Sequence, residues 1–260
     1  MIVTPARPVQ SVGKRCLRIC HNANGDNARW NMSDEPHTLA RQRMVATIAA
    51  ETIFACASLG KAALAQRVLD ALGRVPRHDF VPVELQPFAY VNSPLPIGCG
   101  KTISQPFIVA LMTDLLDVQA TDRVLEIGTG LGYQAAVLAE LCGSVHSVEI
   151  IEELANAARE RLRRRKHAKI KLKIGNGYYG WPEHAPYDKI IVTAAPDLLP
   201  PPLIAQLAPG GRMVIPAGLP GEQRLLLVEK DAAGTITTTD VLAVRFSELE
   251  GTDSPSSSVS

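Results

Sequence analysis

The sequence has almost no net charge, because 27 Lys and Arg residues stand against 26 Asp and Glu residues and leave a formal charge of +1 at pH 7. A charge this close to zero supplies no general attraction to nucleic acid or to an anionic membrane surface. Either partner would need a local basic patch, and we expect neither of them for this chain.

The chain also has few cysteines, and they are scattered: Cys16, Cys20, Cys56, Cys99 and Cys142. A chain of 260 residues buries a sizeable core without disulfides, which indicates reduced thiols and a cytoplasmic location. Residues 16–21 are one residue too long for a haem-attachment motif and lack a second ligand pair, so no metal site is expected.

No apolar run is long enough to span a bilayer, which takes about 20 residues. Residues 44–60 follow Arg41 and Arg43 and contain an A-C-A sequence like a signal-peptide cleavage site. Because Glu51 lies in the middle of this run, an amphipathic helix is predicted instead of an exported or membrane-spanning segment.

The order of the remaining features indicates one domain, over residues 37–250. Residues 1–36 mix Pro, Asn, Gly, Arg and Ser without periodicity and predict a poorly ordered extension, and the polar residues 251–260 predict a disordered tail. Helices are predicted at 37–58 and 62–72. The following segment, up to residue 106, is rich in Pro and Gly, and such a long irregular segment inside a domain is usually functional.

From residue 107 onward, Ile- and Val-rich strands alternate with helices. This alternation predicts an α/β protein with a mostly parallel, doubly wound sheet and helices on both faces. The last two strands are separated only by DAAG and predict an antiparallel hairpin, which is typical of the Rossmann-like class I methyltransferase sheet. Strands are predicted at 123–128, 144–150, 170–175, 187–195, 212–218, 224–230 and 235–246, and helices at 107–117, 133–141, 152–165 and 200–207.

A glycine turn, G-T-G-L-G, follows the first of these strands. In an open α/β sheet the ligand crevice lies beyond the carboxyl ends of the strands, so Gly128, Thr129 and Gly130 are expected to bind a ligand there. The spacing differs from the G-x-G-x-x-G of dinucleotide enzymes. Glu126 is expected to repel a pyrophosphate and to hold a cation, and S-adenosylmethionine carries both a sulfonium and an ammonium.

Two later strand ends fit the same ligand. Glu149 lies 21 residues after Gly128, where an acid can accept both hydroxyls of a ribose. Asn176 follows the third strand and can bind an adenine amino group, while Gly177 leaves room for the ring. Taken alone, the glycine turn is also explained as the ordinary geometry between a strand and a helix, and Glu149 is also explained as a surface acid. The glycine turn, Glu149, Asn176 and Gly177 together predict a nucleoside cofactor.

The chain resembles the protein-L-isoaspartate O-methyltransferases in four stretches that occur in the family's order and spacing: PLPIGCGKTISQPFIVALMTDLL, VLEIGTGLGYQAAVLAEL, APYDKIIVTAA and LAPGGRMVIPAG. RVPRHDFVP and AVRF resemble the family's flanking segments, so the resemblance covers about residues 40–250. It implies a monomeric cytosolic repair enzyme that uses S-adenosylmethionine to methylate the α-carboxylate of L-isoaspartyl residues in damaged proteins and peptides. Residues 37–106 would then face the substrate and 107–250 bind the cofactor.

The resemblance also implies Ser104 as the active-site residue, with Thr102 and Gln105 lining the cofactor site. From the residues alone, Ser104 is as well explained as a cap of the helix that starts near Pro106. A carboxylate acceptor is ionised at neutral pH, so methyl transfer to it needs no general base, and the sequence shows no His–Asp pair near the glycine turn.

Other residues keep two explanations. Residues 192–195 suit an extended peptide or a buried strand end, and Arg245 and Phe246 suit the closure of the substrate cleft or an ordinary strand. The family usually has Asp where this chain has Asn176, which replaces a charge-assisted hydrogen bond with a weaker one and predicts lower cofactor affinity.

Rival functions remain a nucleic-acid or small-molecule S-adenosylmethionine-dependent methyltransferase, a nicotinamide dehydrogenase and a cofactor-binding regulator. The basic residues 159–173 can track phosphates or form the solvated end of a helix. Base-amino methyltransferases usually carry Asp or Asn, Pro-Pro and an aromatic residue after the fourth strand, whereas this chain has AAPD. Glu126 and the glycine spacing disfavour the dehydrogenase.

Overall fold

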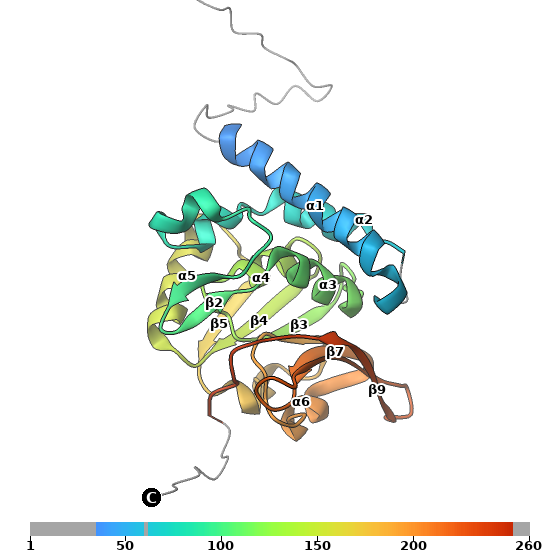
Figure 1. Cartoon of the computed structure of the whole chain (residues 1–260). Helices are drawn as coiled ribbons and strands as arrows, with labels where there is room; N and C mark the ends of the chain where they lie inside the picture. The colour runs from blue at the N-terminus through green and yellow to red at the C-terminus, as the bar shows by residue number, and fades with distance from the viewer. Residues whose placement is uncertain (1–34, 60–61, 252–260) are drawn as a thin grey trace, which may run out of the picture. The chain divides into compact units, whose positions relative to one another are not determined.

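The computed structural model describes residues 35–59 and 62–251 (Figure 1). The sheet and the site lie within the unit Pro36–Ser260. The expected extension and tail, apart from their inner ends, lie outside the described residues, as do Cys16 and Cys20.

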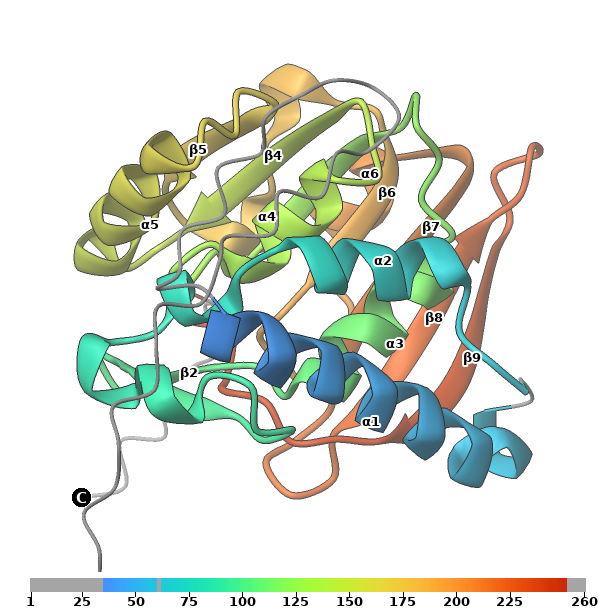
Figure 2. The same ribbon diagram turned by 90° about the horizontal axis from the view of Figure 1, so that it is seen from above.

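A seven-stranded sheet forms the centre of this unit. Its strands lie in the order β5-β4-β3-β6-β7-β8-β9, and Figure 2 labels all of them except β3 in a view from above. The five strands from β5 to β7 are parallel, and β8 and β9 are antiparallel to their neighbours. This confirms the predicted sheet with its terminal hairpin. The strands are β3 (Arg123–Ile127), β4 (Ser144–Glu149), β5 (Ile170–Ile174), β6 (Tyr187–Val192), β7 (Leu207–Ala217), β8 (Arg224–Lys230) and β9 (Ile236–Ala243).

The two faces of the sheet carry separate hydrophobic clusters. Five helices pack over one face and bury residues such as Val124 and Val145, while α6 and a short 3-10 helix (η3, Gly177–Tyr179) pack on the other, against Ile127 and Val148. Strand side chains alternate between the faces, so both faces are buried, as a parallel sheet requires. The helices are α1 (Glu35–Leu59), α2 (Gln66–Arg74), α3 (Pro106–Leu116), α4 (Tyr133–Ala139), α5 (Glu152–Arg164) and α6 (Pro201–Gln206).

The apolar run at 44–60 forms most of α1, as predicted. Met44, Ile48 and Thr52 are buried at a spacing of four residues, so one face of the helix packs on the domain. Ile53 is 62% exposed, and apolar and polar residues are not segregated to opposite faces of α1, so the prediction of an amphipathic helix is wrong. No helix within residues 35–59 and 62–251 is both long and apolar enough to cross a membrane.

Four predicted boundaries are wrong by three residues or more. The strands expected at 187–195 and 235–246 end at Val192 and Ala243, and the other two are element starts. The helix expected at 62–72 begins only at Gln66, because Ala65 N donates to Oδ1 of Asp114 at 2.7 Å and is held in an extended conformation. Strand β7 begins at Leu207 and not at 212. A register shift opposite Tyr187 accommodates the Pro-Gly-Gly residues at its start.

The Pro- and Gly-rich segment before residue 106 contains short helices and strands that the sequence did not predict. Two 3-10 helices, η1 (Arg77–Phe80) and η2 (Val83–Phe88), precede a separate hairpin of β1 (Leu95–Gly98) and β2 (Lys101–Ile103). Gly98, Cys99 and Gly100 all have positive φ angles, of 97°, 51° and 68°. They make the tight hairpin turn that brings β2 and the residues after it to the site.

His146 on β4 is a buried histidine away from the strand ends. It is 3% exposed, and neither ring nitrogen has a hydrogen-bond partner in the described part of the chain. Its ring packs against Trp181, His184 and Tyr187. Burial, together with the charge of His184, lowers its pKa from 6.5 to about 4, so His146 is neutral at pH 7.

Candidate active site

The glycine turn joins β3 to α4 and lies against the end of β6. Gly128 has a φ of +94°, and a Cβ added there would lie 2.4 Å from Oγ1 of Thr193. The Thr193 hydroxyl donates to the carbonyl oxygens of Ile127 and Gly128, at 3.0 and 2.7 Å. Glycine is therefore required at position 128 by the backbone conformation. It is also required because the Thr193 side chain, which follows the neighbouring strand β6, approaches so closely.

Glu149 ends β4 and accepts two backbone hydrogen bonds. Gly130 N donates to Oε2 at 2.7 Å, and Ile151 N donates to Oε1 at 3.0 Å. Hydrogen bonds to a charged acceptor are the stronger ones, so this carboxylate fixes the glycine turn against the start of α5.

Glu126 does not face a ligand. Its side chain is fully buried, and Oε2 accepts a hydrogen bond from the Ser147 hydroxyl, which lies 2.5 Å from the Thr129 hydroxyl. The alternation along β3 places Glu126 on the helix-covered face with Val124. Burial raises its pKa from 4.5 to about 8, so it is mostly neutral at pH 7. The expectation that its charge selects against a pyrophosphate is therefore wrong.

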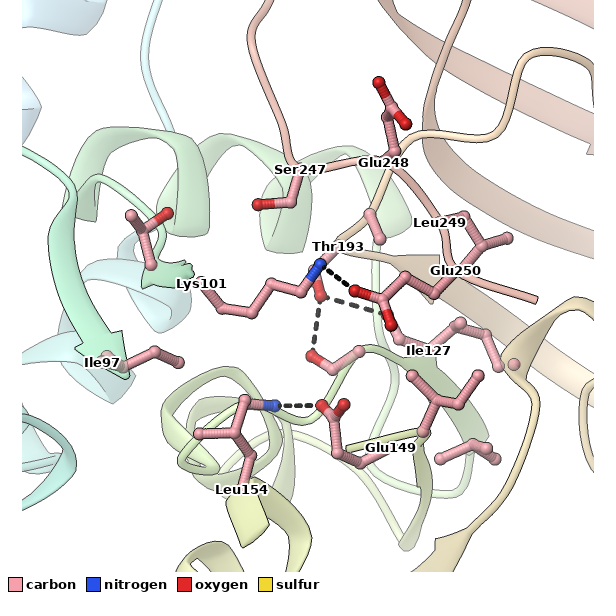
Figure 3. A pocket seen from close by; sticks show the side chains of 17 residues that line it. Ile97, Lys101, Ile127, Glu149, Leu154, Thr193, Ser247, Glu248, Leu249 and Glu250 are labelled. Carbon is pink, nitrogen blue, oxygen red and sulfur yellow. Dashed lines mark hydrogen bonds and ion pairs between the residues drawn. The ribbon is translucent and has the colours of Figure 1, made fainter. Parts of the chain in front are cut away.

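A cavity with about 570 Å³ of empty space, here called the cofactor cavity, lies beyond the carboxyl ends of β3, β4 and β6 (Figure 3). Its apolar wall includes Val148 and Leu154, and apolar walls with a few polar groups are typical of small-molecule sites. Five predicted cofactor residues line it: Thr102, Gly128, Gly130, Glu149 and Gly177. A Cβ at Gly177 would lie 2.4 Å from Cγ2 of Ile127. The predicted residues that do not line it are Ser104, Gln105, Glu126, Thr129 and Asn176.

Residues 247–251 are here called the closing segment, and its residues 247–250 form another wall of the cofactor cavity. Their backbone exchanges two hydrogen bonds with Ala195, at 2.8 and 2.9 Å. Lys101 Nζ lies 2.6 Å from Oε1 of Glu250, and Figure 3 shows this ion pair across the cavity. The β1–β2 hairpin and the closing segment thus meet over the cavity, an arrangement that the sequence did not predict.

Asn176 fastens the closing segment from the other side. Its Nδ2 donates to the carbonyl oxygen of Gly251 at 2.8 Å, and its Oδ1 accepts from Tyr178 N at 2.9 Å. Only an amide can make both bonds, because a carboxylate has no donor. These two bonds leave one lone pair of Oδ1 unused, but Asn176 does not line the cofactor cavity, so the adenine contact expected from the sequence stays a prediction.

A second cavity, here called the cleft, adjoins the first. Three residues line both cavities: Thr102, Thr193 and Ser247. Ser104, Gln105, Arg245 and Phe246 line the cleft, and Glu51 of α1 lies on its wall. Thr193 belongs to the small, apolar stretch 192–195, and only the parallel pairing of β6 with β3 shows that its hydroxyl reaches the glycine turn. Val192 itself is buried.

Ser104 does not cap α3, so that alternative is wrong. The capping residue is Gln105, which makes no side-chain capping bond, and the N–H of Phe107 donates to Oδ1 of Asn92 at 2.9 Å instead. No partner for the Ser104 hydroxyl is found in the part of the chain that the structure describes. The hydroxyl is thus available at the cleft.

The basic stretch at the end of α5 is largely paired. Arg163 and Arg164 both bind Glu160, and Arg165 forms an ion pair with Asp79. These contacts agree with a solvated helix end. Within residues 35–59 and 62–251, no group of three or more His, Cys, Asp or Glu side chains is placed to hold a metal ion.

Comparison with known proteins connects this geometry to a family. The family described as protein-L-isoaspartate(D-aspartate) O-methyltransferase (PCMT) matches residues 55–254. Protein-L-isoaspartate O-methyltransferase 1 of Polaromonas sp. (strain JS666) is 62% identical over 219 residues, which cover 84% of this chain and 93% of that protein.

Solved structures agree with these sequence relatives. A structure of a protein-L-isoaspartate O-methyltransferase has a TM-score of 0.70 and 28% identity, over 81% of this chain and 66% of that chain. A Plasmodium falciparum protein, described as such an enzyme in complex with S-adenosyl-L-homocysteine, has a TM-score of 0.66 and 22% identity, over 81% and 98%. The chain therefore belongs to the protein-L-isoaspartate(D-aspartate) O-methyltransferase family, whose members are S-adenosylmethionine-dependent.

Proposed function

We propose that this chain transfers the methyl group of S-adenosylmethionine to the α-carboxylate of L-isoaspartyl residues in damaged proteins and peptides. Membership of the family supports the reaction. The observation that carries the proposal is that the cofactor cavity and the cleft share Thr102, Thr193 and Ser247. A cofactor in one cavity and a peptide in the other would therefore meet at these residues.

The methyl transfer requires no proton transfer by the protein. The acceptor carboxylate is an anion at neutral pH, and bound S-adenosylmethionine supplies a methyl group activated by its sulfonium. A carboxylate oxygen forms the new C–O bond while the C–S bond breaks and its electron pair goes to sulfur, so no proton is released. The following backbone amide nitrogen then attacks the ester carbonyl and expels methanol, which closes a succinimide. Water opens part of this succinimide to normal aspartate.

The chain's own residues hold the two reactants in line, which is an effect of proximity and orientation. The Ser104 hydroxyl donates a hydrogen bond to the acceptor carboxylate, with Gln105 beside it in the cleft. Glu149 accepts the ribose hydroxyls, Gly128 and Gly130 admit the cofactor close to the backbone, and Gly177 leaves room for adenine. Thr129 contributes by holding the glycine turn in place through the hydrogen bond between its hydroxyl and that of Ser147.

The decisive experiment uses methyl-labelled S-adenosylmethionine with three acceptors: an isoaspartyl peptide, its normal aspartyl isomer and RNA. We expect base-labile label on the isoaspartyl peptide alone. Replacing Ser104 by alanine is expected to lower kcat about 10- to 100-fold, because a hydrogen bond to a charged group contributes roughly 1.5–3 kcal/mol. Label on RNA, or on no acceptor, would contradict the proposed reaction.

The matched control for that variant is Ser93→Ala, in the same irregular segment. The Ser93 hydroxyl is exposed and makes only a 3.4 Å contact with the Pro94 carbonyl oxygen. Its removal is expected to leave kcat unchanged. Equal losses of kcat in the two variants would contradict the role of Ser104 but not the proposed reaction.

A second prediction concerns Asn176. The sequence alone predicts tighter cofactor binding with Asp than with Asn176, but the contact with Gly251 predicts the reverse. Replacement by Asp removes the donor to Gly251 and places a carboxylate against that carbonyl oxygen, so the cofactor is expected to dissociate about five- to ten-fold faster, as loss of a bond near 1 kcal/mol implies. Stopped-flow displacement of S-adenosylhomocysteine measures this rate, with Asn156→Asp on α5 as the control. Slower dissociation would instead mean that a charged bond to adenine dominates.

The setting of the enzyme is also part of the proposal. We place it in the cytoplasm, as a monomer with one methyltransferase domain over residues 37–250 and with no nucleic-acid or membrane partner. The near-neutral charge of the chain and the ion pairs of Arg163, Arg164 and Arg165 with acidic side chains support the absence of a nucleic-acid or membrane partner.

A further inference from the structure

Arg77 is a fully buried arginine that the reaction described above does not use. It begins η1, is 0% exposed, and makes no ion pair with any carboxylate in the described part of the chain. Burial lowers its pKa from 12.5 to about 10, so it still carries its charge at pH 7. An unpaired buried charge is costly, and the contacts of Arg77 must offset that cost.

Those contacts join three segments that are distant in the sequence. Nε donates to the carbonyl oxygen of Ala89 at 2.9 Å, and Nη2 donates to the carbonyl oxygen of Ser104 at 2.8 Å. The guanidinium carbon lies 4.9 Å from the ring centre of Tyr133, a cation–π distance. Tyr133 is the first residue of α4, directly after the glycine turn. One side chain therefore connects the backbone of Ser104 to the element that starts at the cofactor turn.

The shape of the guanidinium suits this task. Its donors lie in one plane and at fixed angles, so Nε and Nη2 can hold two carbonyl oxygens while the flat face stacks on a ring. A lysine ammonium is a single point charge and cannot keep all three contacts. In the described part of the chain, the bond donated by Arg77 Nη2 is the hydrogen bond that holds the Ser104 carbonyl oxygen.

We propose that Arg77 is a positioning residue for methyl transfer, because its guanidinium holds the backbone of Ser104 at a fixed place relative to the glycine turn. The Ser104 hydroxyl is thereby kept at the cleft, beside the residues shared with the cofactor cavity. This inference rests on the proposed role of Ser104. Arg77 does not touch either reactant, and it acts only through the position of Ser104.

The test is a double-mutant cycle with Arg77→Lys and Ser104→Ala, assayed as kcat and KM with an isoaspartyl peptide. Each rate is divided by the fraction of protein that binds S-adenosylhomocysteine in a calorimetric titration, which removes unfolded protein from the comparison. Arg77→Lys is expected to lower kcat about ten-fold, with KM for S-adenosylmethionine changed less than about two-fold. In the Ser104→Ala background the same change should lower kcat less than about two-fold, because contacts in one network are not additive.

Two further variants keep the cycle informative. Arg161→Lys on α5 is the matched control, because Arg161 Nε also donates to a carbonyl oxygen, that of Asp79, at 3.1 Å but contacts neither Ala89 nor Ser104. Its kcat should not change. If Arg77→Lys does not fold, Tyr133→Leu takes its place in the cycle, since it removes the stacked ring and keeps both carbonyl bonds.

The outcomes separate this inference from the proposed function. If the unaltered protein does not methylate the isoaspartyl peptide, both are overturned. If the unaltered protein is active but the Arg77 or Tyr133 substitution lowers kcat by the same factor with and without Ser104, the reaction stands and the positioning role is wrong. A ten-fold loss that vanishes in the Ser104→Ala background supports the positioning role.

Discussion

Replacing Gly128 by alanine is expected to abolish measurable binding of S-adenosylmethionine and to lower the free energy of unfolding by about 3 kcal/mol. The new Cβ would lie 2.4 Å from Thr193 Oγ1, a contact that side chains do not tolerate. The φ of +94° adds backbone strain, and strain and overpacking each cost roughly 1–3 kcal/mol. To relieve the contact, Thr193 must give up its bonds to the carbonyl oxygens of Ile127 and Gly128, which distorts the turn.

Gly210→Ala is the matched control for this substitution. Gly210 also has a positive φ, of +78°, but nothing lies within 4 Å of an added Cβ. It should show only the backbone strain, about 1 kcal/mol, and normal cofactor binding. Chemical denaturation and calorimetric titration measure both quantities. Equal effects at the two glycines would mean that the approach of Thr193 does not limit the turn.

Replacing Glu149 by glutamine is expected to weaken the binding of S-adenosylmethionine about 100-fold. The carboxylate uses one oxygen for Gly130 N and the other for Ile151 N. Glutamine has only one acceptor oxygen, so its NH₂ group must face one of these N–H groups. The loss of a charged hydrogen bond costs roughly 1.5–3 kcal/mol, and the ribose hydroxyls also lose their acceptor.

Glu152→Gln serves as the control for that variant. Glu152 is an exposed acid in the first turn of α5, three residues from Glu149. Its replacement removes the same charge near the same helix but no bond to the glycine turn. Cofactor affinity should stay within about two-fold, as expected for an exposed charge. A 100-fold loss in both variants would assign the effect to the overall charge and not to the bonds of Glu149.

The sequence predicted the sheet and much of the cofactor cavity because both follow from local patterns. Alternating strands and helices determine the parallel order, and strand ends bring Gly128, Glu149 and Gly177 to one edge. Such reasoning requires only that each residue lies near the end of its strand. It does not require knowledge of any distant partner.

The parts that were missed depend on direction or on long-range contacts. Glu126 lies close to the glycine turn in the sequence, but the alternation along β3 turns its side chain away from the edge and under α4. The cap of α3 comes from Asn92, 15 residues before Phe107. The contact between Asn176 and Gly251 spans 75 residues, and no local pattern indicates such a pair.

The buried Glu126 also makes folding a proton-linked reaction. Its pKa is about 8 in the folded protein and 4.5 as a free side chain, so between these values the folded chain binds a proton that the unfolded chain does not. Stability from this group is fully present below pH 4.5 and is lost as the pH rises through 8. His146 acts in the opposite sense, because its folded pKa of about 4 lies below its ordinary 6.5. At and above pH 7 His146 is mostly neutral in both states, so for these two groups unfolding releases part of the proton of Glu126 into the buffer.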